Sequence, residues 1–199
     1  SVLHREYGQN ARIRVQACKC TPCQNAGTLQ RQSFGFSYLA RNPLIMPNWL
    51  KLIISLILPQ VAGGTGAYFT ITSIESWYQT INKPSFNPPG WLFGPVWTTL
   101  YLLMGIACYL IWKSDHPQKK PLLILYFTQL GLNALWSPAF FGMESPILGL
   151  VVIIPLWILI FLSVKKFKLI NAWASWLMIP YLAWVSFATV LNFSIWWLN

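Results

Sequence analysis

The sequence contains five apolar stretches, each about as long as a helix that crosses a bilayer. They cover residues 49–71, 91–112, 121–141, 146–164 and 172–197. A helix needs about 20 mostly apolar residues to span the hydrocarbon core of a membrane. Polar or proline-rich segments separate the stretches. The sequence therefore predicts an all-α integral membrane protein, a bundle of five transmembrane helices with a long loop between the first and second.

The composition also favours a multi-pass membrane protein. Hydrophobic residues make up 55% of the 199 residues and charged residues only 9%, whereas soluble domains carry roughly a quarter charged residues. Despite a net charge of +10, so apolar a chain is not expected to be a soluble enzyme or to bind nucleic acid. The lipid bilayer is the expected partner.

Residues 1–46 differ in composition from the body at 47–199. They hold six of the 14 basic residues, three of the four cysteines and none of the 12 tryptophans. An arginine-rich, acid-poor leader of this kind resembles an organelle transit segment, and a disordered basic tail or an artificial extension is the alternative. Its cysteines (Cys18, Cys20, Cys23) have only His4 as a nearby fourth ligand, and no metal site is predicted.

Lysines are distributed unevenly among the predicted loops. With five spans, Lys51 and the loops 113–120 and 165–168 fall on the same face as the N-terminus, and the other face holds only Lys83. Positively charged loops stay in the cytoplasm. The N-terminus and both lysine-rich loops are therefore expected to be cytoplasmic in a bacterial inner membrane, while in an organelle membrane only their relative orientation is fixed.

Polar residues at membrane depth are candidate functional residues. Gln129, Asn133 and Ser137 repeat every fourth residue on the third span, with Trp136 at the edge, so they share one helix face. Uncompensated amides are costly in lipid, so this face should point into the bundle. Spacing alone favours, slightly, the alternative that these residues only join neighbouring helices.

The second span carries aromatic side chains at the same interval, at Phe93, Trp97 and Tyr101. On the fifth span Trp184, Ala188 and Asn192 are spaced in the same way. Ala188 leaves room between larger neighbours, either for a helix or for a ligand. Together the three faces would line an aromatic cavity with a few amides, which suits flat aromatic ligands.

The connection at residues 77–90 is rich in proline and too long for a simple link. We expect it to be a lid over the mouth of the bundle. Lys83 is a candidate contact for an anionic ligand group, and a solvated loop lysine is the alternative. The body shows no paired carboxylates, metal cluster, nucleophile elbow or phosphate loop, so no classical catalytic site is predicted. Whether the protein is an enzyme is left open.

The body carries motifs of a known family in the family's order. They include Trp77-Tyr78, Lys83-Pro84, Pro88-Pro89-Gly90-Trp91, Gly94-Pro95-Val96-Trp97-Thr98, Trp136-Ser137, Pro180-Tyr181-Leu182-Ala183-Trp184 and Leu191-Asn192. With these motifs, nearly all of residues 47–199 resembles the TspO/MBR family of translocator proteins and tryptophan-rich sensory proteins. The leader is outside the resemblance.

The resemblance implies a five-helix membrane protein, often a homodimer, that binds porphyrin, haem and other flat hydrophobic molecules as ligands and requires no cofactor. It implies a cavity under the first loop, lined by Tyr78, Pro88, Trp97, Tyr101, Asn133, Trp136, Ser137, Trp184 and Ala188. We add Gln129 to these ligand-binding residues because it shares a helix face with Asn133.

The function implied by the resemblance is that of a receptor or sensor for tetrapyrroles, and a transporter of porphyrin or lipid is the alternative. Trp97 and Trp184 match tryptophans implicated in light-dependent porphyrin breakdown by bacterial members, so they would be catalytic only in a photochemical protein. The sterol-recognition pattern of animal members is incomplete, because Phe193 stands in place of its tyrosine and no basic residue follows.

Overall fold

The computed structural model describes residues 46–199, and within this range it contains helices and no strands. The elements are α2 (Asn48–Ile74), α3 (Trp77–Thr80), α4 (Gly90–Trp112), α5 (Lys119–Ser137), the π-helix η1 (Pro138–Gly142), α6 (Pro146–Phe167) and α7 (Ala172–Leu198). The predictions for the leader, its cysteine cluster included, fall on residues that lie outside the described range.

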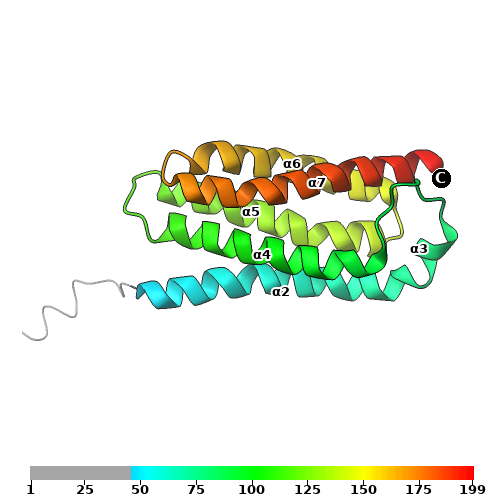
Figure 1. Ribbon diagram of the computed structural model, residues 1–199, viewed down its shortest axis with the longest axis horizontal. Helices are drawn as coiled ribbons and strands as arrows, with labels where there is room; N and C mark the ends of the chain where they lie inside the picture. The colour runs from blue at the N-terminus through cyan, green and yellow to red at the C-terminus, as the bar shows by residue number, and fades with distance from the viewer. Residues whose placement is uncertain (1–45) are drawn as a thin grey trace, which may run out of the picture. The chain divides into compact units, whose positions relative to one another are not determined.

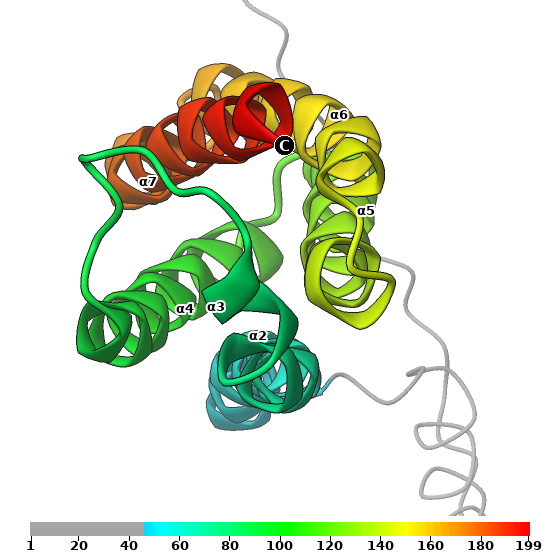
Figure 2. The same cartoon turned by 90° about the vertical axis from the view of Figure 1, so that its right-hand side faces the viewer.

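The long helices pack around a closed ring. In this ring α2 contacts α4, α4 contacts α7, α7 contacts α6, α6 contacts α5, and α5 contacts α2, as the end-on view in Figure 2 shows. Long helices that follow one another in the chain run in opposite directions (Figure 1). The α4–α5 and α6–α7 connections therefore lie at the same end of the bundle as the start of α2, and α3 lies at the other end.

Four helices, α2, α4, α6 and α7, are long and apolar enough to cross a membrane. The prediction of an all-α membrane protein is thus confirmed. The α5 helix is less apolar because it begins with Lys119 and Lys120 and carries buried Gln129 and Asn133. A fifth crossing by α5 therefore stays a prediction.

The predicted third span, residues 121–141, is not one regular helix. Pro138 has no N–H to donate and ends α5, and the chain continues as η1. There, the N–H of Met143 donates to the carbonyl of Pro138 (2.9 Å) and that of Ser145 to the carbonyl of Phe140 (3.1 Å). This wider turn packs the rings of Phe140 and Phe141 into a buried apolar cluster that also contains Tyr78.

Side-chain caps fix where α6 and α7 begin, and a glycine lets α4 pack closely on α2. The α6 and α7 helices are capped by Ser145 and Asn171, whose side chains accept hydrogen bonds from the backbone at 3.4 and 3.1 Å. The α2 and α4 backbones approach closely at Gly105, where a Cβ would lie 2.6 Å from the carbonyl oxygen of Ser55. Cys108, one turn further along α4, is buried.

Candidate functional site

A cavity of about 470 Å³ lies in the half of the bundle that carries α3. Its lining comes from α2, α3, α4, α5, η1 and α7, and its volume falls within the range of about 300–1,000 Å³ typical of small-molecule sites. The lining includes no charged side chain. Nine aromatic residues contribute to it: Tyr78, Phe93, Trp97, Tyr101, Trp136, Phe140, Phe141, Trp184 and Phe187.

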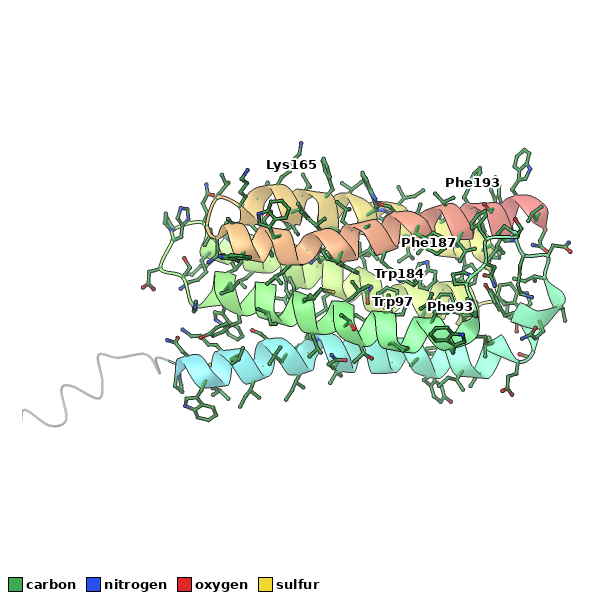
Figure 3. The ribbon with its side chains drawn as sticks, viewed as in Figure 1. Phe93, Trp97, Lys165, Trp184, Phe187 and Phe193 are labelled. Carbon is green, nitrogen blue, oxygen red and sulfur yellow. The ribbon has the colours of Figure 1, made fainter. Side chains whose placement is uncertain are left out.

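The aromatic faces of α4 and α7 meet at one wall of the cavity. Trp97 stacks on Tyr101, with ring centroids 5.3 Å apart, and lies perpendicular to Trp184 at 6.4 Å. Phe93 packs edge-on against Trp184 at 6.0 Å. Figure 3 shows Phe93, Trp97, Trp184 and Phe187 close together between the two helices. The four-residue spacing therefore identified side chains that the structure brings together.

The polar face of α5 contacts helices on both sides. The Tyr101 hydroxyl donates to Asn133 Oδ1 (2.9 Å), and Asn133 Nδ2 donates to the Tyr181 hydroxyl (2.9 Å). Ser137 Oγ donates to the carbonyl of Gly66 on α2 (2.8 Å). Asn133 and Ser137 also line the cavity. These two residues thus join helices and contribute polar atoms to the site.

Three predicted site residues lie outside the lining of the cavity. Gln129 is fully buried between α5 and α6, where its Oε1 accepts a hydrogen bond from Ser163 Oγ at 3.3 Å. Pro88 lies in the connection between α3 and α4 and is half-buried. Lys83 is also half-buried, with its ammonium 5.1 Å from the centre of the Tyr78 ring. The other predicted ligand-binding residues all line the cavity.

The lid, which consists of α3 and residues 81–89, closes one end of the cavity. Buried Tyr78 donates from its hydroxyl to Asn87 Oδ1 (2.8 Å). Burial raises the pKa of Tyr78 to about 12, and the hydrogen bond to Asn87 offsets part of this shift. Asn82 and Asn199 exchange hydrogen bonds between side chain and backbone at 2.9 and 3.0 Å. The lid is therefore bonded both within itself and to the end of α7.

The lining residues on α2 were not anticipated as a binding face. Gln60, Gly64, Ala67 and Ile71 line the cavity at intervals of three or four residues, the spacing of one helix face. Gly63 also lines the cavity, and a Cβ there would collide with the Tyr101 ring. The missed signal was a row of small and polar residues on an otherwise bulky apolar helix.

Comparisons with known proteins match the region that forms the bundle. Residues 55–198 match the model of the TspO/MBR family. The chain is 45% identical over 152 residues to the tryptophan-rich protein TspO of Archaeoglobus fulgidus, which covers 76% of this chain and 99% of that protein. It is 34% identical to the tryptophan-rich sensory protein of Cereibacter sphaeroides, covering 76% and 93%. It is 33% identical to the translocator protein of Homo sapiens, covering 75% and 90%.

Proposed function

Because this chain belongs to the TspO/MBR family, we propose that it is a membrane receptor or sensor for tetrapyrroles, such as porphyrin and haem, and for similar flat hydrophobic ligands. The names of relatives, "sensory protein" and "translocator protein", support a receptor role. The observation that carries the proposal is the cavity whose lining is aromatic and uncharged. Such a lining favours ligands that stack and bury apolar surface.

A flat ring system would bind among the indoles of Trp97, Trp136 and Trp184. Each aromatic contact contributes about 0.5–1.5 kcal/mol beyond the burial of apolar area. The lining offers no cation for an acidic substituent, so the propionates of a porphyrin would point toward the lid. There Lys83 and the backbone near Asn82 are the nearest partners in the lid for an anionic group. Lys83 would then contact a ligand without lining the cavity.

The test is a titration of protoporphyrin IX into the full-length protein in detergent, followed by the absorbance of the porphyrin Soret band. The double variant Trp97→Phe with Trp184→Phe keeps rings at both positions but loses the larger stacking area of the indoles. We expect its Kd to rise by about tenfold, since 1.4 kcal/mol corresponds to a factor of ten.

Trp157→Phe is the matched control for this titration. Trp157 lies on α6, donates to Ser186 Oγ at 2.7 Å and stacks on Phe161, all outside the cavity. Its substitution should leave porphyrin affinity unchanged. Equal affinity in the wild type and the double variant would show that the tetrapyrrole binds elsewhere.

Light-dependent porphyrin breakdown is the second candidate function. The cavity holds two perpendicular indoles, Trp97 and Trp184, which are the redox-active groups that could donate an electron to an excited porphyrin, with dioxygen as the oxidant. The measurement is the decay of the Soret band of bound protoporphyrin IX under illumination in air. Decay no faster in the wild type than in the double variant would exclude this role.

The helix α5 bears on both the number of membrane crossings and the oligomeric state. We propose that α5 crosses the membrane as a fifth transmembrane helix, because it completes the ring of packed helices, and that two copies form a homodimer. Of the small residues that permit helix association, Gly105 and Ala107 are buried within the bundle, whereas Gly131 on α5 is exposed and its missing Cβ would meet open space. A dimer would therefore use the α5 face.

A further inference from the structure

We infer that ligands reach the cavity sideways from the hydrocarbon core of the membrane, through a seam between α2 and α4. This inference rests on the proposed function and adds the route and the class of ligand. We define the α2–α4 seam by Gln60, Gly64 and Ala67 on α2 and by Gly94 and Thr98 on α4, all of which line the cavity.

The exposure of the lining residues locates the opening. The exposed members of the lining are Gly64, Ala67, Ile71, Gly90, Gly94 and Thr98, all on α2 or α4. Lining residues on α3, α5, η1 and α7 are buried or half-buried. The cavity is therefore open toward the outside of the bundle along α2 and α4.

The seam is closed at one end and widens toward the lid. At Gly105 the two backbones touch, since a Cβ there would lie 2.9 Å from Leu56 Cα. Further along, Gln60 Nε2 donates to the backbone carbonyl of Thr98 at 3.3 Å and bridges the two helices. Beyond this bridge a Cβ added at Gly64 or at Gly94 would meet nothing within 4 Å. Glycines thus keep the seam open where the cavity lies.

The surface around the seam faces lipid rather than water. Large apolar side chains on α2 flank it and are strongly exposed: Val61 at 58%, Tyr68 at 67% and Ile71 at 68%. Both helices are apolar enough to cross a membrane. An opening with these flanks within a membrane-spanning segment would admit molecules dissolved among the acyl chains.

The end of the cavity that faces water is closed by the lid. No residue of the connection 81–89 lines the cavity, and Tyr78, which does, is only 7% exposed. The hydrogen bonds of Tyr78 to Asn87 and of Asn82 to Asn199 hold the lid in this position. The ligand class is therefore a flat molecule that partitions into the bilayer and enters with an apolar edge first. A strongly water-soluble anion has no comparable route.

The test measures rates with the full-length protein in phosphatidylcholine nanodiscs and protoporphyrin IX as the probe. Gly64→Phe and Gly94→Phe each place a ring in the open part of the seam. A barrier on the route slows entry and exit alike, so we expect the association and dissociation rate constants both to fall by about tenfold.

Val151→Phe is the matched control, because Val151 lies in the apolar helix α6, is strongly exposed and does not line the cavity. Its rates should equal those of the wild type. Unchanged rates in both seam variants would overturn the inference, and so would a weaker affinity with unchanged association. Absence of binding by the wild type would instead overturn the proposed function.

A second measurement tests the seam without a porphyrin. In a background with the native cysteines changed to alanine, the thiol of an Ala188→Cys variant would face the cavity from α7. We expect it to react with N-(1-pyrenyl)maleimide dissolved in the bilayer, and more slowly when Gly64→Phe is added. Reaction with the pyrene reagent that is as fast with Gly64→Phe as without it would overturn the lateral route.

Discussion

Asn133 links three helices through one side-chain amide. It accepts a hydrogen bond from Tyr101 on α4 and donates one to Tyr181 on α7, while lying on α5 itself. Both phenols are buried, and neither has another side-chain hydrogen-bond partner within residues 46–199. The same amide lines the cavity, so the roles of joining helices and shaping the site coincide in this residue.

Asn133→Leu should destabilise the bundle. The substitution leaves two buried hydroxyls without partners, at a cost of about 1–3 kcal/mol for each. The free energy of unfolding, measured in detergent with increasing SDS, should fall by that amount. Thr128→Val on the exposed face of the same helix removes a hydroxyl bonded only to its own helix and should have little effect. Equal losses in the two variants would contradict the assigned role.

Small residues on α4 do two different things at different positions of the helix. At Gly105 the absence of a side chain allows the α2 backbone to approach within contact distance, whereas at Gly94 it leaves open space beside the cavity. The helix is therefore tightly packed in the half that lies toward Trp112 and loosely packed in the half that carries Trp97. This difference in packing places the cavity within the bundle.

Gly105→Ala should be destabilising although alanine is the better helix former. The added Cβ would lie 2.6 Å from a backbone oxygen of α2, and overpacking of this kind costs about 1–3 kcal/mol. The opposite sign is expected for Gly131→Ala, where nothing obstructs the Cβ and the gain in helix propensity is about 0.5–1 kcal/mol. Thermal unfolding in detergent measures both, and a stabilised Gly105→Ala variant would refute the close approach.

The lid should respond to alkaline pH through Tyr78. Burial raises the pKa of its phenol from 10.0 to about 12 in the folded protein, because a buried site disfavours the phenolate. The unfolded chain therefore loses this proton first, so the stabilisation is complete below pH 10 and is lost as pH rises toward 12. The free energy of unfolding should fall less steeply over this interval in Tyr78→Phe than in the wild type. Parallel pH profiles would argue against a buried, neutral phenol.

Charge is segregated between the two ends of the bundle. Within residues 46–199, seven of the eight lysines lie at the end where α2 begins, with Asp115 as the only acidic residue there. Glu75, Glu144 and Lys83 belong to the other end. Tryptophans near both ends are strongly exposed, such as Trp49, Trp91 and Trp173, as expected for interfacial belts. The molecule as a whole thus has the charge pattern that orients a membrane protein.

Labelling of single cysteines in sealed vesicles tests this orientation and the number of crossings. In a background without native cysteines, Gln118→Cys and Leu169→Cys should react with a membrane-impermeant maleimide from one side of the membrane. Ser85→Cys and Met143→Cys should react from the other side. Reaction of positions 118 and 143 from the same side would show that α5 does not cross.

The sequence by itself determined where the long helices lie and which of their faces carry polar and aromatic residues. The apolar stretches predict α2, α4, α6 and α7 to within a few residues at their ends. The spacing of Trp97 with Tyr101 and of Trp184 with Ala188 predicts helix faces that do line one cavity. These properties are local, because hydropathy and helical periodicity depend only on neighbours in the chain.

Only the tertiary structure decided which polar residues border the cavity. Gln129 and Asn133 are one turn apart on the same face, yet Gln129 meets Ser163 of α6 while Asn133 lies beside the cavity. Likewise, only packing places Gln60 and the glycines of α2 in the lining, and Pro138 turned the end of the third predicted span into a π-helix. A cavity is the space that side chains from several helices leave unfilled, and no single helix specifies it.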